Sequence, residues 1–122
     1  MRTALRTGFA SLLLLAFIAV SSAAGVACNK NFKVQNKTDK TIVKFFVSPY
    51  QSDDWEDNVL NGDIEPDTGI PVNMASDDRN YSLYDVKAVF DDGTKQEGYK
   101  INLCRAATIN IYDDKVTYID SE

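Results

Sequence analysis

The sequence predicts an all-β protein, an antiparallel two-sheet β-sandwich of about seven strands with one short helical turn near residues 53–60. Three observations support this fold class. Beyond the first 24 residues, apolar side chains recur at every second position, as they do in half-buried strands. Turn-forming residues separate these alternating segments, and no long helical pattern interrupts them. A small barrel is the second architecture that the pattern fits.

The N-terminus predicts an export signal over residues 1–24. Arg2 and Arg6 form a basic region, "GFASLLLLAFIAV" (8–20) forms an apolar region, and "SSAAGVA" supplies small residues suited to cleavage. The apolar run ends at Ser21, short of the roughly 20 apolar residues that a spanning helix needs. We therefore expect one domain over residues 25–122, periplasmic or extracellular, with no transmembrane segment in the mature chain.

The alternating segments give the expected strands in chain order. They are residues 31–35, 41–47, 69–74, 82–90, 98–104, 107–112 and 115–119. The segment 41–47 has apolar residues on both faces, so we expect both of its faces to be buried. Pro71 cannot donate a ladder hydrogen bond, which predicts that its strand lies at a sheet edge. The turns "NKTDK" (36–40), "DDGT" (91–94) and Asp113-Asp114 are each predicted to close an antiparallel hairpin.

The stretch "SPYQSDDWEDNVL" (48–60) interrupts the strand pattern. Asp53 with Glu56 matches a capping box, and Trp55 and Val59 then lie one helical turn apart on one face. We expect this turn to bury Trp55 over an open end of the sandwich. The other interpretation is a binding surface formed by Tyr50 and Trp55, whose rings combine contact area with a polar tip.

The charge of the mature chain excludes a nucleic-acid-binding function. The two signal arginines are removed, so 11 of the 13 basic residues remain with 18 acidic ones, a net charge of −7. A phosphate-binding protein needs a cationic face, whereas these lysines are scattered among acids. The acidic surface favours basic partners or cations.

The two cysteines have two possible fates. A Cys28–Cys104 disulfide fits an oxidising compartment and would contribute on the order of 4 kcal/mol by closing a long loop. The alternative is lipid attachment at Cys28, because "GVAC" (25–28) resembles a lipoprotein processing site. The two fates exclude each other, and we expect the disulfide.

Little in the sequence supports catalysis. The chain has no histidine, and the motifs of serine hydrolases, metalloproteases and phosphate-binding loops are absent. We therefore expect no enzymatic activity and no cofactor, with calcium as the one metal to consider. "NGDIEPDTG" (61–69) places oxygen donors at alternate positions, and Asp63, Glu65 and Asp67 are its candidate ligands.

Three stretches resemble a group of small exported bacterial proteins of uncharacterised function. They are "FFVSPYQSDDWEDNVL" (45–60), "YDVKAVFDDG" (84–93) and "INLC" (101–104). The shared pattern is a strand ending in SP, a Trp followed by Asn-x-Leu, a YD strand ending in DG, and a closing NLC. The resemblance implies that Trp55, Asn58 and Leu60 form a recurring structural corner, and it implies no activity.

These observations predict a small, soluble, exported binding or interaction module whose partner is an unidentified protein or glycan. Two alternatives remain at this point. One is a hydrolase that acts on glycans through loop carboxylates. The other is an acidic inhibitor of a basic host enzyme, suggested by small size, export and charge.

Overall fold

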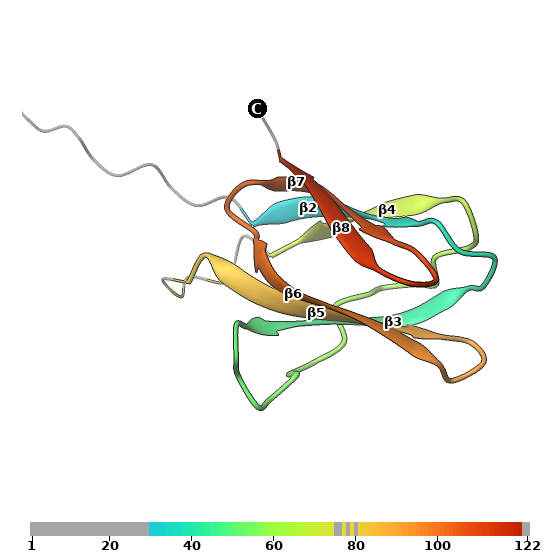
Figure 1. Cartoon of the computed structure of the whole chain (residues 1–122), viewed down its shortest axis with the longest axis horizontal. Coiled ribbons are helices and arrows are strands. Elements are labelled where there is room, and N and C mark those ends of the chain that lie inside the picture. The colour runs from blue at the N-terminus through green and yellow to red at the C-terminus, as the bar shows by residue number, and fades with distance from the viewer. Residues whose placement is uncertain (1–29, 75–76, 78, 80, 121–122) are drawn as a thin grey trace, which may run out of the picture.

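The computed structural model describes residues 30–74, 77, 79 and 81–120, and within this part seven strands form two sheets packed face to face (Figure 1). The strands are β2 (Asn31–Asn36), β3 (Ile42–Pro49), β4 (Gly69–Asn73), β5 (Leu83–Phe90), β6 (Lys95–Asn102), β7 (Ala106–Ile111) and β8 (Val116–Asp120). The predicted all-β two-sheet fold of about seven strands is confirmed. The predicted signal segment and Cys28 lie outside the described residues.

One sheet has four strands in the order β4-β2-β7-β8, and the other has three in the order β3-β5-β6. Every pairing is antiparallel except that of β2 with β7, which run parallel with Val34 opposite Ile109. The expectation of purely antiparallel sheets is therefore wrong at this one pairing. No short turn connects β2 to β7, so no hairpin fixes their relative direction.

Two of the three predicted hairpins are confirmed. The turn "DDGT" connects the antiparallel strands β5 and β6, and the Asp113-Asp114 turn connects β7 and β8. The "NKTDK" prediction is wrong, because this segment leads from β2 in one sheet to β3 in the other. Asn36 shapes this corner: its buried Nδ2 donates to the carbonyls of Lys40 (2.7 Å) and Ile64 (3.0 Å).

The core lies between the inner faces of the two sheets. Phe32 and Val34 from β2 face Phe45 and Val47 from β3, and the rings of Phe32 and Phe45 lie 6.4 Å apart. A register shift between Ile42 and Lys44 turns Ile42 to the same inner face as Phe45. The outer face of β3 is less covered than we predicted from the sequence, since Phe46 is only half-buried.

The predicted helical turn near residues 53–60 is wrong, since the described part of the chain contains no helix there or elsewhere. Residues 58–64 instead extend along the edge of β3, with bridges from Asn58 to Phe46 and from Ile64 to Ile42. The Asn58 Oδ1 atom accepts the backbone N–H groups of Phe45 (2.9 Å) and Leu60 (3.1 Å). Pairing with an open strand edge therefore outweighs the local capping signal.

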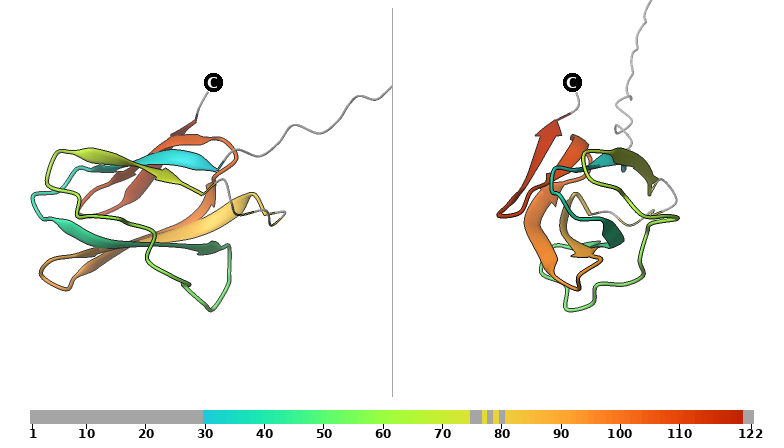
Figure 2. Two further views of the ribbon diagram at one scale, coloured as in Figure 1. Left: turned by 180° about the vertical axis from the view of Figure 1, so that it is seen from behind. Right: turned by 90° about the vertical axis from the view of Figure 1, so that its right-hand side faces the viewer.

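The two edge strands of the four-stranded sheet, β4 and β8, have different surroundings. The edge strand β4 carries Pro71, as predicted, and the loop 59–63 lies beside it. The other edge strand, β8, lies at the margin of the sandwich (Figure 2). No helix in the described residues is long and apolar enough to cross a membrane.

Candidate functional site

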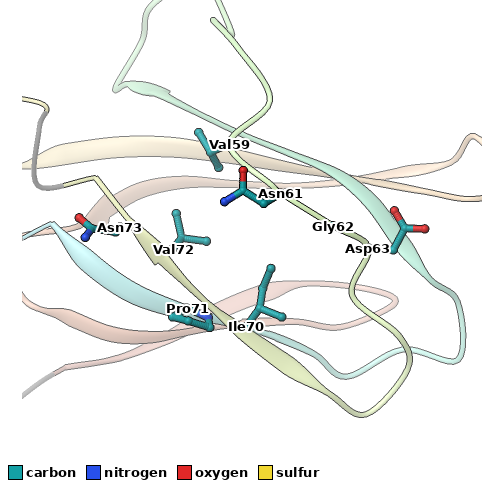
Figure 3. A pocket seen from close by; sticks show the side chains of 8 residues that line it. All are labelled: Val59, Asn61, Gly62, Asp63, Ile70, Pro71, Val72 and Asn73. Atoms are coloured by element: carbon teal, nitrogen blue, oxygen red, sulfur yellow. The ribbon is translucent and has the colours of Figure 1, made fainter.

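A groove of about 650 Å³ lies between β4 and the loop that covers the edge of β3 (Figure 3). Val59 from the loop and Ile70 and Val72 from β4 point toward one another across it. The eight residues that line this groove are Val59, Asn61, Gly62, Asp63, Ile70, Pro71, Val72 and Asn73. Its volume lies within the range of small-ligand sites, and its lining combines aliphatic and polar side chains.

The strand pattern explains how the groove forms. Ile70 and Val72 pair with Val34 and Phe32 of β2 and share their inward face. Because β4 is the last strand of its sheet, nothing in the sheet covers the outer flank of these two side chains. The loop after β3 is held at the edge of the other sheet by the Ile64 bridge to Ile42. The groove is the space left between these two edges.

The rim of the groove has polar groups with unused bonding capacity. Among the described residues, no side chain or backbone group bonds the carboxylate of Asp63 or the amide of Asn61. Gly62 lies between them, and a Cβ added there would meet no atom within 4 Å. The rim can therefore donate and accept hydrogen bonds and can neutralise one positive charge on a ligand.

A second polar cluster closes one end of the sandwich, and we call Lys30, Glu56, Asp77, Arg79 and Tyr84 the end cluster. The Lys30 side chain is only 2% exposed, and its Nζ donates to the carbonyls of Asp77 (3.2 Å) and Arg79 (2.8 Å). The Asp77 Oδ1 lies 3.9 Å from the same Nζ. The buried ammonium thus ties the residue before β2 to the segment before β5.

Asp77 is the centre of the end cluster. Its carboxylate accepts the Arg79 Nε at 2.9 Å and the Tyr84 hydroxyl at 3.1 Å. Arg79 also donates to both Glu56 oxygens, at 2.9 and 3.2 Å, and so reaches the loop after β3. The hydrogen bonds from Arg79 hold the pKa of Asp77 well below its usual range. Burial raises the pKa of the Tyr84 hydroxyl.

The end cluster is a structural site. Its charges are paired with one another, and the Arg79 guanidinium forms ion pairs with Asp77 and Glu56. Perturbed pKa values also arise in structural ion-pair networks. Among the residues that the structure describes, each charged group of the cluster has a partner within it, so the cluster fastens the loop after β3 to the sandwich end and leaves the groove as the candidate site.

Trp55 and Tyr50 both lie on the loop after β3, and neither is among the hydrophobic side chains that pack against the core. A lysine from the three-stranded sheet makes a cation–π contact with each ring. The Lys87 Nζ lies 4.8 Å from the centroid of the Trp55 ring, and the Lys100 Nζ lies 5.6 Å from the centroid of the Tyr50 ring. The burial predicted for Trp55 is only partial, since both rings are half-buried. They pack on the outer face, where Lys87 also contacts Phe46.

Asp85 explains why this loop follows the outer face. Its carboxylate is 6% exposed and accepts the backbone N–H groups of Gln51 (3.2 Å) and Lys100 (3.0 Å). Both of these residues have left-handed φ values, 66° and 62°. A carboxylate that accepts two such donors compensates the strain of these conformations. The "YD" of the sequence was the only signal for this role.

The three calcium candidates do not gather. Glu65 accepts the Thr41 hydroxyl at 3.2 Å, Asp67 occupies a turn with a φ of 61°, and Asp63 lies at the groove. Within the described residues, no group of three or more acidic, cysteine or histidine side chains could hold a metal ion. The geometry therefore lends the calcium hypothesis no support.

The structure describes only one of the two cysteines in the predicted disulfide. Cys104 lies half-buried in the turn between β6 and β7, and its backbone N–H bonds the Asn102 Oδ1 at 3.0 Å. Its predicted partner, Cys28, lies outside the described residues. The bridge stays a prediction.

Sequence reasoning missed most of the groove and the end cluster. It named Asp63 but not Ile70 or Val72, which alternation marked only as core. Lys30 and Asp77 carried no signal, because their roles depend on segments 47 residues apart.

No protein-family model and no curated protein matches the chain. A similar solved structure is the NMR structure of a protein from Eubacterium rectale, with a TM-score of 0.53. The two are 17% identical over 83% of this chain and 98% of the other. At that identity the likeness concerns the fold alone. The resemblance to small exported bacterial proteins of uncharacterised function stays a prediction.

Proposed function

We propose that this protein is a small exported binding module without catalytic activity, and that its ligand occupies the groove between β4 and residues 59–63. The observation that carries the proposal is the groove itself: an aliphatic floor beside a carboxylate and an amide with no partner among the described residues. Such a combination fixes an apolar group by contact and orients it by a few polar bonds.

The lining favours a protein partner over a glycan. None of the eight lining residues is aromatic, so a sugar ring finds no flat surface on which to stack. Val59, Ile70 and Val72 suit the methylene stem of a lysine or arginine, whose charged end would then reach Asp63. The groove therefore fits a basic side chain presented by another protein.

The charge of the molecule supports the same partner class. The predicted mature chain carries a net charge of −7, which attracts basic surfaces and speeds their association. An inhibitor that acts on a basic host enzyme would be one case of this function.

NMR titration tests the proposal. The probe is a short extended peptide with one central arginine, and the same peptide with glutamate is the control. We expect the arginine peptide to shift the resonances of Val59, Ile70 and Val72 at moderate salt, and the glutamate peptide to leave them unchanged.

Two variants make that titration specific. Gly62→Phe should fill the groove and remove the response without unfolding, because the space around Gly62 is open. Asp113→Phe, in the exposed β7–β8 turn, should retain it. A response to the arginine peptide that survives Gly62→Phe would overturn the groove as the site. A response to oligosaccharides alone would overturn the proposal of a basic protein partner. Turnover of oligosaccharides would overturn the proposed absence of catalysis.

Export and the disulfide belong to the same proposal and rest on the signal-like residues 1–24 and on Cys28 and Cys104. Intact-mass analysis of protein from its native host tests both. We expect the mass of the chain without its signal segment, reduced by the two hydrogens that disulfide formation removes. We also expect no reactive thiol. A diacylglycerol group on Cys28 would show anchoring by lipid instead.

A further inference from the structure

The loop that borders the groove carries two asparagines, Asn58 and Asn61, which differ in how firmly their side chains are held. The Asn58 Oδ1 accepts the backbone N–H groups of Phe45 (2.9 Å) and Leu60 (3.1 Å), so this amide is fixed against the edge of β3. Asn61 is exposed, and its amide bonds no group among the described residues. The Asn61 side chain is therefore free to change its rotamer.

The backbone nitrogen that follows each asparagine differs in the same way. After Asn58, the N–H of Val59 donates to the Phe45 carbonyl at 2.9 Å, and the β-branched side chain of Val59 crowds that nitrogen. After Asn61, the N–H of Gly62 bonds nothing in the described part of the chain. A Cβ added at Gly62 would meet no atom within 4 Å, so this peptide unit has room to rotate.

The freedom of these two groups permits a covalent reaction between them. The backbone nitrogen of Gly62, once deprotonated by solvent, can attack the side-chain Cγ of Asn61. The new N–Cγ bond replaces the Cγ–Nδ2 bond, and Nδ2 leaves as ammonia after taking up a proton equivalent to the one that the backbone nitrogen lost. Water then opens the cyclic imide at either carbonyl and leaves aspartate or isoaspartate at this position. Water is the only co-reactant.

We propose that Asn61 is a site of spontaneous deamidation in the folded protein, and that the reaction adds a second carboxylate to the rim of the groove. Asn61 and Asp63 lie on the same loop and both line the groove (Figure 3). The product therefore has two negative charges at the rim where the newly made chain has one. For the basic ligand proposed above, on which this consequence rests, the added charge strengthens binding.

A second position in the chain has a similar local sequence but is protected. Asn61 is the only asparagine that precedes a glycine, and Asp92 is the only aspartate that does so. The Asp92 Oδ1 accepts the Thr94 hydroxyl at 2.6 Å, and the Gly93 N–H donates to the Phe90 carbonyl at 2.9 Å. Both groups needed for ring closure are thus occupied at Asp92, and neither is occupied at Asn61.

Peptide mapping by mass spectrometry tests the reaction. The mature protein is incubated under mildly alkaline conditions in which it stays folded. We expect Asn61 to gain about 1 Da with time while Asn58 stays unchanged. Gly62→Ala should slow the gain on the order of tenfold, because the added methyl group crowds the attacking nitrogen. It should leave the melting temperature nearly unchanged, since the space around Gly62 is open. Equal rates at Asn58 and Asn61, or no effect of Gly62→Ala, would overturn the proposal.

The unfolded chain provides the control that separates structure from sequence. In urea the rate at Asn61 depends on its local sequence alone. Because the fold holds neither Asn61 nor Gly62, the rate in the folded protein should lie within about threefold of the rate in urea. A folded protein that reacts far more slowly than the unfolded chain would show that the fold protects this site, and would refute the proposal.

Asn61→Asp reproduces the added charge without the reaction. Its affinity for the arginine peptide should rise on the order of threefold at moderate salt, whereas the neutral control Asn61→Gln should bind like the unmodified protein. An unchanged affinity for Asn61→Asp would overturn the effect on binding. If the arginine peptide does not bind even the unmodified protein while Asn61 still gains mass, the modification site is supported and the proposed ligand is refuted.

Discussion

The end cluster and the rim of the groove are both rich in polar side chains, yet they differ in how those side chains are used. In the end cluster, Asp77 accepts from Arg79 and Tyr84 while Lys30 donates to two carbonyls. At the groove, Asp63 and Asn61 have no such partners among the described residues. The first set holds the fold together, and the second is free to hold a ligand.

The difference shows that polarity alone does not identify a binding site. A buried charge must be paired, because removing it from water without a partner is costly. Lys30 and Asp77 meet that requirement within the chain, which leaves them little to offer a ligand. Asp63 is solvated and meets no such requirement, so its position beside an aliphatic floor makes it the better candidate.

The largest effect should come from breaking the end cluster at Lys30. Lys30→Met keeps the stem but leaves the carbonyls of residues 77 and 79 without their donor, at a cost of about 3 kcal/mol. Urea unfolding measures it. Lys33→Met, at an exposed position of the adjoining strand β2, is the control and should change stability by less than about 0.5 kcal/mol. Equal effects would mean that the cluster stabilises nothing.

The second prediction concerns acid stability. The pKa of Asp77 is lowered on folding, so its ionised form stabilises the fold above the unfolded value near 4, and this contribution is lost as the pH falls toward the folded pKa. Asp77→Asn should therefore cost about 2 kcal/mol at neutral pH, and the deficit should shrink below about pH 4.

Unfolding curves between pH 7 and 2 measure this convergence. Asp113→Asn, at an exposed turn position, is the matched control and should leave stability nearly unchanged throughout. A deficit for Asp77→Asn that stays constant down to pH 2 would contradict the role of the ionised carboxylate.

The sequence predicted the fold well where short-range physics decides it. Alternation located the strands within a few residues, and Pro71 correctly marked an edge. The prediction was wrong at Asn36 to Lys40, where turn residues are equally suited to a hairpin and to a corner. Only the buried bonds of Asn36, one of them to Ile64 far along the chain, decide between the two.

The site was less predictable, because it depends on where strands end. Val72 looks like any core residue in sequence, and it lines a groove only because β4 has no further neighbour. The loop after β3 shows the same effect, since its capping signal was real but the edge of β3 offered bonds at Phe45 and Ile42. Strand order therefore decides what local pattern cannot.

A smaller effect is expected from Trp55, which belongs to the loop that the end cluster fastens through Glu56. Since the ring is half-buried and contacts Lys87, Trp55→Ala should cost about 1 kcal/mol. Phe45→Ala, in the core, should cost about 4 kcal/mol. Trp55 is the only tryptophan, so its fluorescence should be quenched readily by acrylamide. Emission resistant to quenching would show that the ring is buried after all.

The smallest effect on stability is expected at the groove. Asp63→Asn breaks no bond within the described residues, so the melting temperature should stay nearly unchanged, while affinity for the arginine peptide falls about tenfold. Millimolar calcium should also leave the melting temperature unchanged, because Glu65 and Asp67 do not join Asp63 in a ligand group. A calcium-dependent rise that Asp63→Asn removes would instead assign this carboxylate to a metal. The contrast with Asp77 is then direct: one aspartate matters for folding and the other for binding.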